Sequence, residues 1–400
     1  MTRSGRPRIV VAGAGIAGSL IADALGADPR VEILCLERAQ AVDHAEAGTG
    51  LNIGPNAIAC LAAHMPERAA AIVRASLPWR RWTIALTDGA PLFDLDLSDV
   101  ADHAGIRIRW AELYQLLRVP LGHRVIYGAE LVCAGPGRDG RPMLAWRDRC
   151  RSDVETMSGI DLLIGADGRY SRVRTGFFGE DAPRFLGVCL YRLLFPVGED
   201  CPIDDYGQWF NGPNRLLAYR VPGGFVYCAG SFPIPPDAPV PEAMKRPEAL
   251  RAAYTPQSGS LSAEAGFLVA AIERHTDEIH WARLQDGTIH FGAAGVLLVG
   301  DAAHPMVPTL GQGATQAVED ACVAVEEIRA ALDTGRPLAE VPARVAARRA
   351  ARVRFVVDFS REATDTMLAG ADPRAGTLKK RERPFMEKLE RLYRDVPLPA

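Results

Sequence analysis

The sequence has no long apolar run, no closely spaced cysteine pair and no strong excess of charge of one sign. No stretch reaches the roughly 20 apolar residues that a membrane-spanning helix needs. The uncharged run 9–22 contains glycine turn positions and stops at Asp23, so we do not interpret it as an export signal. The net charge of −3 gives no reason to expect nucleic acid as a partner. We expect a cytoplasmic protein that does not enter the membrane.

The 8 cysteines are scattered along the chain. None forms a Cys-x-x-Cys pair, and we find no histidine at the spacing of a metal ligand. This usage is typical of free thiols in a reducing compartment and not of a disulfide framework. It excludes disulfide-reductase chemistry, and we expect no metal site.

Chain length and patterning predict two intimately joined domains. A chain of 400 residues is longer than one hydrophobic core usually serves. Strand and helix patterns of the parallel α/β type occur at both ends, whereas 187–232 is typical of antiparallel sheet. The predicted fold class is therefore α/β, with a dinucleotide-binding (Rossmann-like) domain and an inserted antiparallel β-sheet domain. We assign 1–78, 105–182 and 286–370 to the first domain, 79–104 and 183–285 to the second, and 371–400 to a C-terminal tail.

A glycine-rich turn near the N-terminus predicts a pyrophosphate site. Gly13-Ala14-Gly15-Ile16-Ala17-Gly18 matches GxGxxG and lies between a predicted strand and a predicted helix. Gly13 permits the tight turn, Gly15 lets the backbone approach the phosphates, and Gly18 lets the helix lie close to the strand. The free N–H groups at the helix start attract the anion. A second literal match at 135–140 contains Pro136, so we interpret it as a surface turn.

An acidic residue follows the glycine motif at the expected place. Glu37 ends the second predicted strand and can accept hydrogen bonds from a ribose, or it is a solvated strand end. A ribose-binding acid disfavours a 2′-phosphate, so the site suits FAD or NAD better than NADP.

Two further motifs stand at the ends of predicted strands. Asp167-Gly168 follows the strand that begins at Asp161, and Gly300-Asp301 follows an apolar strand and precedes Pro308-Thr-Leu-Gly311-Gln-Gly313-Ala314. With GxGxxG ahead of them, these motifs resemble the para-hydroxybenzoate hydroxylase family of flavoprotein aromatic monooxygenases. The resemblance runs from about residue 8 to about residue 365. It is firm for the FAD-binding pieces and weak for the antiparallel middle.

The resemblance implies that FAD is the bound dinucleotide. It gives Asp301 the ribityl chain or ribose as partner, although Asp301 also suits a helix N-cap. Arg109 matches a family arginine that contacts the flavin, or it is a solvated charge at a helix end. The segment 48–56 resembles the loop beside the isoalloxazine ring. The predicted cofactor-binding residues are Gly13, Ala14, Gly15, Ala17, Gly18, Glu37, Arg38, Arg109, Val132, Asp167, Asp301, Gly311, Gly313 and Ala314.

The resemblance also implies the reaction. NADH or NADPH reduces FAD, O2 adds to give a flavin hydroperoxide, and a phenolic or hydroxy-N-heteroaromatic ring is hydroxylated. Because the chain has one credible dinucleotide site, the nicotinamide donor binds transiently. We expect a monomer or homodimer.

The sequence constrains the substrate site weakly. We expect a pocket between the flavin and the antiparallel middle, with Leu51, Trp209, Tyr219 and Pro308 as candidate substrate residues. Core packing is the favoured interpretation for most of the aromatic residues in this region. Pro308 matches a family proline near the reacting carbon, and His304 is either an acid or base or a structural residue. Arg215 or Arg220 can bind a carboxylate, or each is a solvated strand residue. The arginines of the helix expected over 341–367 suggest a wet basic face.

Three alternatives stay open. A flavin-dependent halogenase shares GxGxxG but carries Trp-x-Trp-x-Ile-Pro, whereas Trp79-Arg-Arg-Trp82-Thr-Ile lacks that spacing and the proline. An NAD-dependent dehydrogenase explains the first motif and leaves 301–314 unexplained. A non-catalytic FAD-binding protein is the third alternative.

Overall fold

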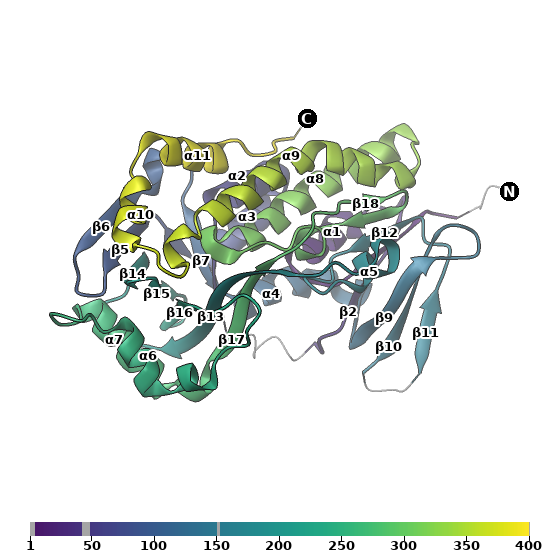
Figure 1. Cartoon of the computed structure of the whole chain (residues 1–400). Helices are drawn as coiled ribbons and strands as arrows, with labels where there is room; N and C mark the ends of the chain where they lie inside the picture. The colour runs from purple at the N-terminus through teal and green to yellow at the C-terminus, as the bar shows by residue number, and fades with distance from the viewer. Residues whose placement is uncertain (1–4, 42–48, 150–152, 400) are drawn as a thin grey trace.

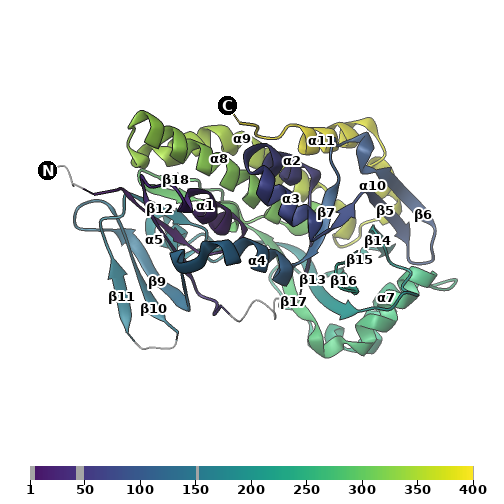
Figure 2. The same ribbon diagram turned by 180° about the vertical axis from the view of Figure 1, so that it is seen from behind.

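The computed structural model describes residues 5–41, 49–149 and 153–399. It has two lobes, which Figures 1 and 2 show from opposite sides. One lobe is built on a six-stranded sheet and the other on a seven-stranded sheet.

The six-stranded sheet is mostly parallel and buried on both faces. Its order is β18-β19-β12-β1-β2-β8, and only β18 runs antiparallel to its neighbour. Alternate residues of β1 point to two different hydrophobic clusters, which explains its continuous apolar sequence. The strands are β1 (Arg8–Ala12), β2 (Glu32–Glu37), β8 (Val125–Tyr127), β12 (Leu162–Gly165), β18 (Gly292–Ala293) and β19 (Val296–Leu298).

Helices cover one face of this sheet, and a small sheet covers the other. The first face packs against α1 (Ile16–Gly26), α2 (Pro55–His64) and α8 (Gln312–Thr334), with α9 (Val341–Glu362) outside α8. The second face packs against α5 (Arg172–Phe178) and the antiparallel strands β9 (Ala129–Pro136), β10 (Pro142–Asp148) and β11 (Val154–Met157). The second GxGxxG match spans the end of β9 and the turn that leads to β10, and it is a surface turn as predicted.

The seven-stranded sheet has the order β17-β13-β16-β15-β14-β5-β6. One face packs against α6 (Pro247–Tyr254) and α7 (Ala263–Arg274), and the other faces α9 and the C-terminal helices. The strands are β5 (Arg81–Leu86), β6 (Pro91–Asp96), β13 (Arg184–Pro196), β14 (Tyr206–Asn211), β15 (Asn214–Val221), β16 (Phe225–Pro233) and β17 (His280–Asp286).

A small sheet of order β3-β7-β4 joins the two lobes. It contains β3 (Gly50–Ile53), β4 (Leu77–Trp79) and β7 (Gly105–Arg109), and α3 (Pro66–Arg74) and α4 (Trp110–Arg118) pack near it. β3 contacts β16 as well as α8, so the segment predicted to pass the flavin ring lies between the lobes.

The predicted fold class is confirmed. Each strand of the two large sheets belongs to the sheet of the lobe that the predicted domain limits assign it to. The limits themselves stay a prediction. The segment 371–400 is more than a tail, because α10 (Pro373–Lys379) and α11 (Arg383–Arg394) pack over the second lobe (Figure 1). Within the described residues, no helix is both long and apolar enough to cross a bilayer.

Two sequence-based interpretations are wrong. The arginines of α9 do not all face water, because Arg349 is completely buried. A histidine does stand at ligand spacing from a cysteine, because Cys60 and His64 lie one helical turn apart on α2. The described cysteines are free, as expected.

Candidate active site

The glycines of the first motif have different roles in the fold. A Cβ on Gly13 would lie 2.4 Å from the Ala166 carbonyl oxygen, and one on Gly18 would lie 2.0 Å from the Gly13 oxygen. Gly13 and Gly18 are therefore required by packing, and Gly13 also has a φ of 102°. A Cβ on Gly15 would meet only the Ala166 oxygen, at 3.9 Å, and Gly15 lines an open cleft. Ala14 and Ala17 are buried in the turn and in the first turn of α1.

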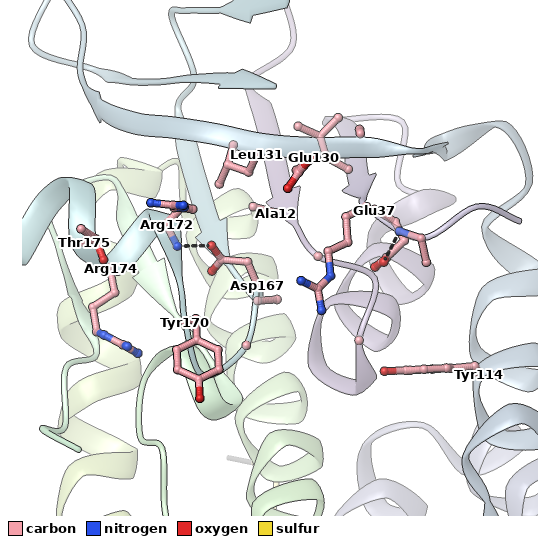
Figure 3. Close-up of a pocket in the computed structure, with 18 of the residues that line it drawn as sticks. Ala12, Glu37, Tyr114, Glu130, Leu131, Asp167, Tyr170, Arg172, Arg174 and Thr175 are labelled. Carbon is pink, nitrogen blue, oxygen red and sulfur yellow. Dashed lines mark hydrogen bonds between the residues drawn. The ribbon is translucent and has the colours of Figure 1, made fainter. Parts of the chain in front are cut away.

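The cleft has a volume of about 810 Å³ and opens at the carboxyl ends of β1, β2 and β12. In Figure 3, Glu37 and Asp167 lie on either side of Ala12, and Glu130 and Leu131 of β9 lie above them. Arg38 also lines the cleft. The predicted residue Val132 is 39% exposed on β9, and its neighbour Leu131 is the residue that lines the cleft.

Glu37 is held rigidly at the cleft wall. Its carboxylate accepts hydrogen bonds from the backbone N–H groups of Ala14, at 2.8 Å, and Ala39, at 2.9 Å. Arg118 forms an ion pair with it at 3.3 Å and donates to the Ala14 carbonyl at 2.7 Å. Sequence reasoning missed Arg118. The sequence does place Arg118 four residues after Tyr114, on the same side of α4. This spacing could have predicted that its guanidinium stacks over the Tyr114 ring, where it lies 3.9 Å from the ring centre.

Asp167 forms the opposite wall and is bonded to the start of α5, whose N-cap is Ser171. Its carboxylate accepts hydrogen bonds from the Ser171 hydroxyl at 2.5 Å and from the N–H groups of Arg172 and Val173 at 2.7 and 3.1 Å. Burial raises the pKa of this carboxyl group despite those bonds. Asp167 is thus already satisfied by the protein, so it shapes the cleft and keeps little spare bonding capacity for a ligand.

Two arginines tie the Asp167 corner to the Asp301 corner. Arg174 donates to the Ala302 carbonyl at 2.8 Å and to the Arg169 carbonyl at 2.6 Å. Arg169 donates to the Met306 carbonyl at 2.9 Å and lies 3.8 Å from the Asp301 carboxylate. Neither arginine was singled out from the sequence. The side chain of Asp301 is 37% exposed and caps no helix, since α8 begins at a Gly311 N-cap, so it is available to a ligand.

The Gly311–Ala314 corner meets the β3 segment. Gly311 has a φ of 66°, and a Cβ there would lie 2.6 Å from Nδ2 of Asn52. The N–H groups that begin α8, at Gly313 and Ala314, have no helical partner and favour negative charge. Pro308 is exposed beside them, and Leu51 lies on β3. Gly48, which belongs to the predicted flavin loop, lies outside the described residues.

Polar groups around this corner lack protein partners. Among the described residues, the buried Nδ2 of Asn52 and the buried Nε of Arg109 have no hydrogen-bond acceptor. Arg109 pairs with Glu112 at 2.6 Å and lies over the Phe225 ring at 4.9 Å, at the junction of the two lobes. Buried donors left in this state indicate a ligand that supplies acceptors. Together with the space beside Gly15 and the exposed Asp301, they fit a long dinucleotide that ends in a polar ring.

His304 is not at the face of this site. It is completely buried, and its Nε2 lies 2.6 Å from the carboxylate of Asp320. Asp320 also accepts the Gly300 N–H at 2.8 Å. The structure therefore gives His304 the structural role and removes it from the acid or base candidates.

The candidate substrate residues do not share one face of the second lobe. Trp209 packs in the cluster under α6 and α7, so we remove it from the site. Tyr219 is on the opposite face, where its hydroxyl lies near the backbone N–H of Asn52 on the β3 segment. Arg215 is on the Tyr219 side and is only 4% exposed. Arg220 instead donates to the Gly198 carbonyl at 2.7 Å, at the edge of the lobe.

Comparison with known proteins agrees with this geometry. Residues 257–360 match a family model described as an FAD binding domain. The chain is 33% identical to a 3-amino-4-hydroxybenzoate 2-monooxygenase of Streptomyces platensis, over 96% of this chain and 94% of that protein. It is 27% identical to a 6-hydroxynicotinate 3-monooxygenase of Bordetella bronchiseptica, over 80% and 82%.

Solved structures show the same fold. The crystal structure of Klebsiella pneumoniae HpxO complexed with FAD and uric acid superposes with a TM-score of 0.80, at 21% identity, and covers 99% of this chain and 98% of that chain. These similarities exclude the dehydrogenase, halogenase and non-catalytic alternatives. The strongest support is the relative that is 33% identical to this chain over nearly the full length of both proteins. The chain belongs to the para-hydroxybenzoate hydroxylase-like family of FAD-dependent aromatic monooxygenases.

Proposed function

We propose that this monooxygenase hydroxylates an aromatic acid, meaning a ring that carries a carboxylate together with a hydroxyl or ring nitrogen. The observation that carries the proposal is Arg215, a buried cation to which no carboxylate of the described residues is hydrogen-bonded. The carboxylated substrates named for the relatives from Streptomyces platensis and Bordetella bronchiseptica support the same class.

Arg215 is almost completely buried, and its Nε has no hydrogen-bond partner among the described residues. The groups that favour its charge are the hydroxyls of Tyr206, Tyr227 and Tyr254, and none of them is a carboxylate. Burial lowers the pKa of the Arg215 guanidinium. A buried guanidinium that is not paired costs several kcal/mol, about 3–5. A substrate carboxylate would satisfy it with two parallel hydrogen bonds.

Tyr219 defines the direction in which such a substrate would extend. Arg215 and Tyr219 lie on the same face of β15, four residues and therefore about 13 Å apart. A benzoate held by Arg215 would point its ring along Leu217 toward Tyr219 and the β3 segment. Burial raises the pKa of the Tyr219 hydroxyl well above its ordinary value, so it stays protonated at neutral pH. It can accordingly donate a hydrogen bond to a substrate oxygen.

Bound FAD supplies the oxygen-activating redox chemistry once a nicotinamide donor has reduced it. We propose NADH or NADPH as that transient donor and O2 as the second substrate. The protein's own part is positional: Asp301, Gly15 and the start of α8 hold the cofactor, and Arg215 and Tyr219 hold the ring. The packed aromatic face around them keeps water out.

A pair of compounds that differ only in the carboxylate tests the proposal. NADH and NADPH oxidation, O2 consumption and hydroxylated product would be measured with 3-amino-4-hydroxybenzoate and with 2-aminophenol. We expect coupled product formation with the acid and little with the phenol. Equal turnover of both compounds would contradict the role of Arg215, and no stimulation by any hydroxyaromatic would contradict aromatic hydroxylation.

We also propose that the protein is cytoplasmic and acts as a monomer or homodimer. The free thiols support a reducing compartment. Light scattering coupled to size exclusion would measure the mass, with a tetramer or larger as the contradicting result.

A further inference from the structure

The seam between α2 and α8 carries a regular series of polar contacts that leads away from the flavin end. The Gly54 N–H donates to Thr315 Oγ1 at 3.0 Å, and Nδ2 of Asn56 donates to Glu319 at 2.6 Å. The far end is closed by His64, whose Nε2 lies 3.2 Å from Glu326. Between these contacts, the next side chains in the seam are two cysteines, Cys60 of α2 and Cys322 of α8.

Cys60, His64 and Cys322 present three metal-ligating atoms to one point. Their two Sγ atoms and a ring nitrogen all lie within 4.8 Å of one another, and the Cys60 Sγ to His64 Nδ1 distance is 3.8 Å. A tetrahedral zinc ion with Zn–S of about 2.3 Å and Zn–N of about 2.0 Å separates its ligands by about 3.5 Å. The observed spacing therefore needs adjustments of about one ångström or less.

The surroundings also suit a metal. Glu326 holds the nitrogen of His64 that points away from the cysteines, which is the usual support for a metal-bound histidine. The Cys60 thiol donates to the Pro397 carbonyl at 3.3 Å, so the C-terminal segment lies against this cluster. Both thiols are buried, and the His64 side chain is 6% exposed. Two thiolates, a neutral imidazole and Zn²⁺ sum to zero charge, which such a buried position tolerates.

We propose that Cys60, His64 and Cys322 form a binding site for a thiophilic divalent cation, Zn²⁺, at the α2–α8 seam. The two thiols release their protons to solvent when the ion enters. Nδ1 of His64 donates to the Cys60 backbone carbonyl at 2.9 Å, so it too releases its proton to solvent when the ion enters and turns its lone pair to the metal, while Nε2 keeps its proton toward Glu326. The ion would then fasten α2, α8 and the C-terminal segment together behind the cofactor site.

Metal analysis of the whole FAD-loaded protein tests the proposal. The protein would be cleared with a chelator under a non-thiol reductant, reloaded with Zn²⁺ and passed through a desalting column. We expect about one Zn²⁺ per chain by mass spectrometry and a higher melting temperature than in the cleared protein. Co²⁺ in its place should give the intense absorption of a tetrahedral thiolate site at wavelengths longer than those of the flavin. Failure of the wild-type protein to retain either ion would overturn the proposal.

Variants locate the site. Cys60→Ser and Cys322→Ser should each abolish Zn²⁺ retention, and Glu326→Gln should weaken affinity about 10–100-fold. Cys228→Ser is the matched control, because Cys228 is equally buried in the second lobe, and it should retain the metal. Cys322→Ala provides a second variant if the serine disturbs folding, which flavin content and circular dichroism report. Retention of Zn²⁺ by both folded cysteine variants would refute the assignment.

Discussion

Arg349 donates from Nε to the carboxylate of Asp320 at 2.9 Å, although both side chains are completely buried. The same guanidinium donates to Glu319 and to Gln316, each at 2.6 Å. Asp320 in turn holds the N–H of Gly300. Through Asp320, the buried Arg349 of α9 is therefore linked by hydrogen bonds to the Gly300–Asp301 corner, which presents Asp301 to the cofactor.

Loss of Arg349 should destabilise the protein strongly. Arg349→Ala removes the cation that neutralises the buried carboxylates of Glu319 and Asp320. Removal of one partner of a buried ion pair costs about 3–5 kcal/mol. The free energy of unfolding would be measured by urea titration together with FAD content. Arg354→Ala, at an exposed position of the same helix, is the control and should change stability by less than about 0.5 kcal/mol. If the two substitutions lowered the free energy of unfolding equally, the buried network would have no special structural role.

Gly15→Ala and Gly18→Ala should separate binding from folding. The methyl group that Gly15→Ala adds would enter the cleft without striking the protein, so the fold should persist while FAD affinity falls about tenfold or more. The methyl group that Gly18→Ala adds would strike the Gly13 carbonyl and push α1 from β1, which should cost several kcal/mol, about 3. Thermal unfolding of the FAD-free protein and fluorescence titration with FAD distinguish the two effects. Unchanged FAD affinity in the Gly15→Ala variant would contradict the placement of the pyrophosphate.

Asp167→Asn should change how stability depends on pH. The pKa of Asp167 is raised by burial, so the folded state binds a proton more tightly than the unfolded state. Its charge therefore destabilises the fold at neutral pH, and this cost disappears as pH falls below the ordinary carboxyl pKa of about 3.9. The asparagine variant lacks the charge, so its stability relative to wild type should grow as pH rises from about 4 and then level off. If the stability difference between the variant and the wild-type protein did not depend on pH, burial would not disfavour the charge of Asp167.

Asp301→Ala should yield FAD-poor protein that still folds. The carboxylate is partly exposed beside Gly313, and within the part of the chain that the structure describes its one ion pair is the long contact with Arg169, so its loss removes a cofactor partner and little else. Flavin absorbance of the purified protein and its Kd for added FAD measure the effect. Asp333→Ala, on the exposed end of α8, is the control. A fully yellow Asp301→Ala protein with unchanged affinity would show that Asp301 does not touch the cofactor.

The sequence predicted the local structure of the dinucleotide-binding lobe well because its signals are local. The turn at Gly13–Gly18, the strand end at Glu37 and the helix after Gly311 each carry their structural reason within a few residues. The burial of Arg349 and the position of Arg118 depend instead on which helix packs against which sheet, and a single sequence shows neither. Trp209 and Tyr219 show the same limit, because alternation along β14 and β15 predicts two faces without saying which one meets the flavin.

Arg215→Met should raise stability and impair substrate binding at the same time. Removal of an unpaired buried charge relieves its desolvation cost, so the free energy of unfolding of the substrate-free protein should increase. The lost charge-assisted hydrogen bonds, worth about 1.5–3 kcal/mol, should raise KM for the aromatic acid about 10–100-fold. Turnover of a substrate analogue without the carboxylate should not fall. Arg220→Met, whose guanidinium serves a backbone carbonyl at the lobe edge, should leave KM within about twofold of wild type. A methionine variant that is less stable than wild type and binds the acid normally would mean that Arg215 is satisfied by the protein itself.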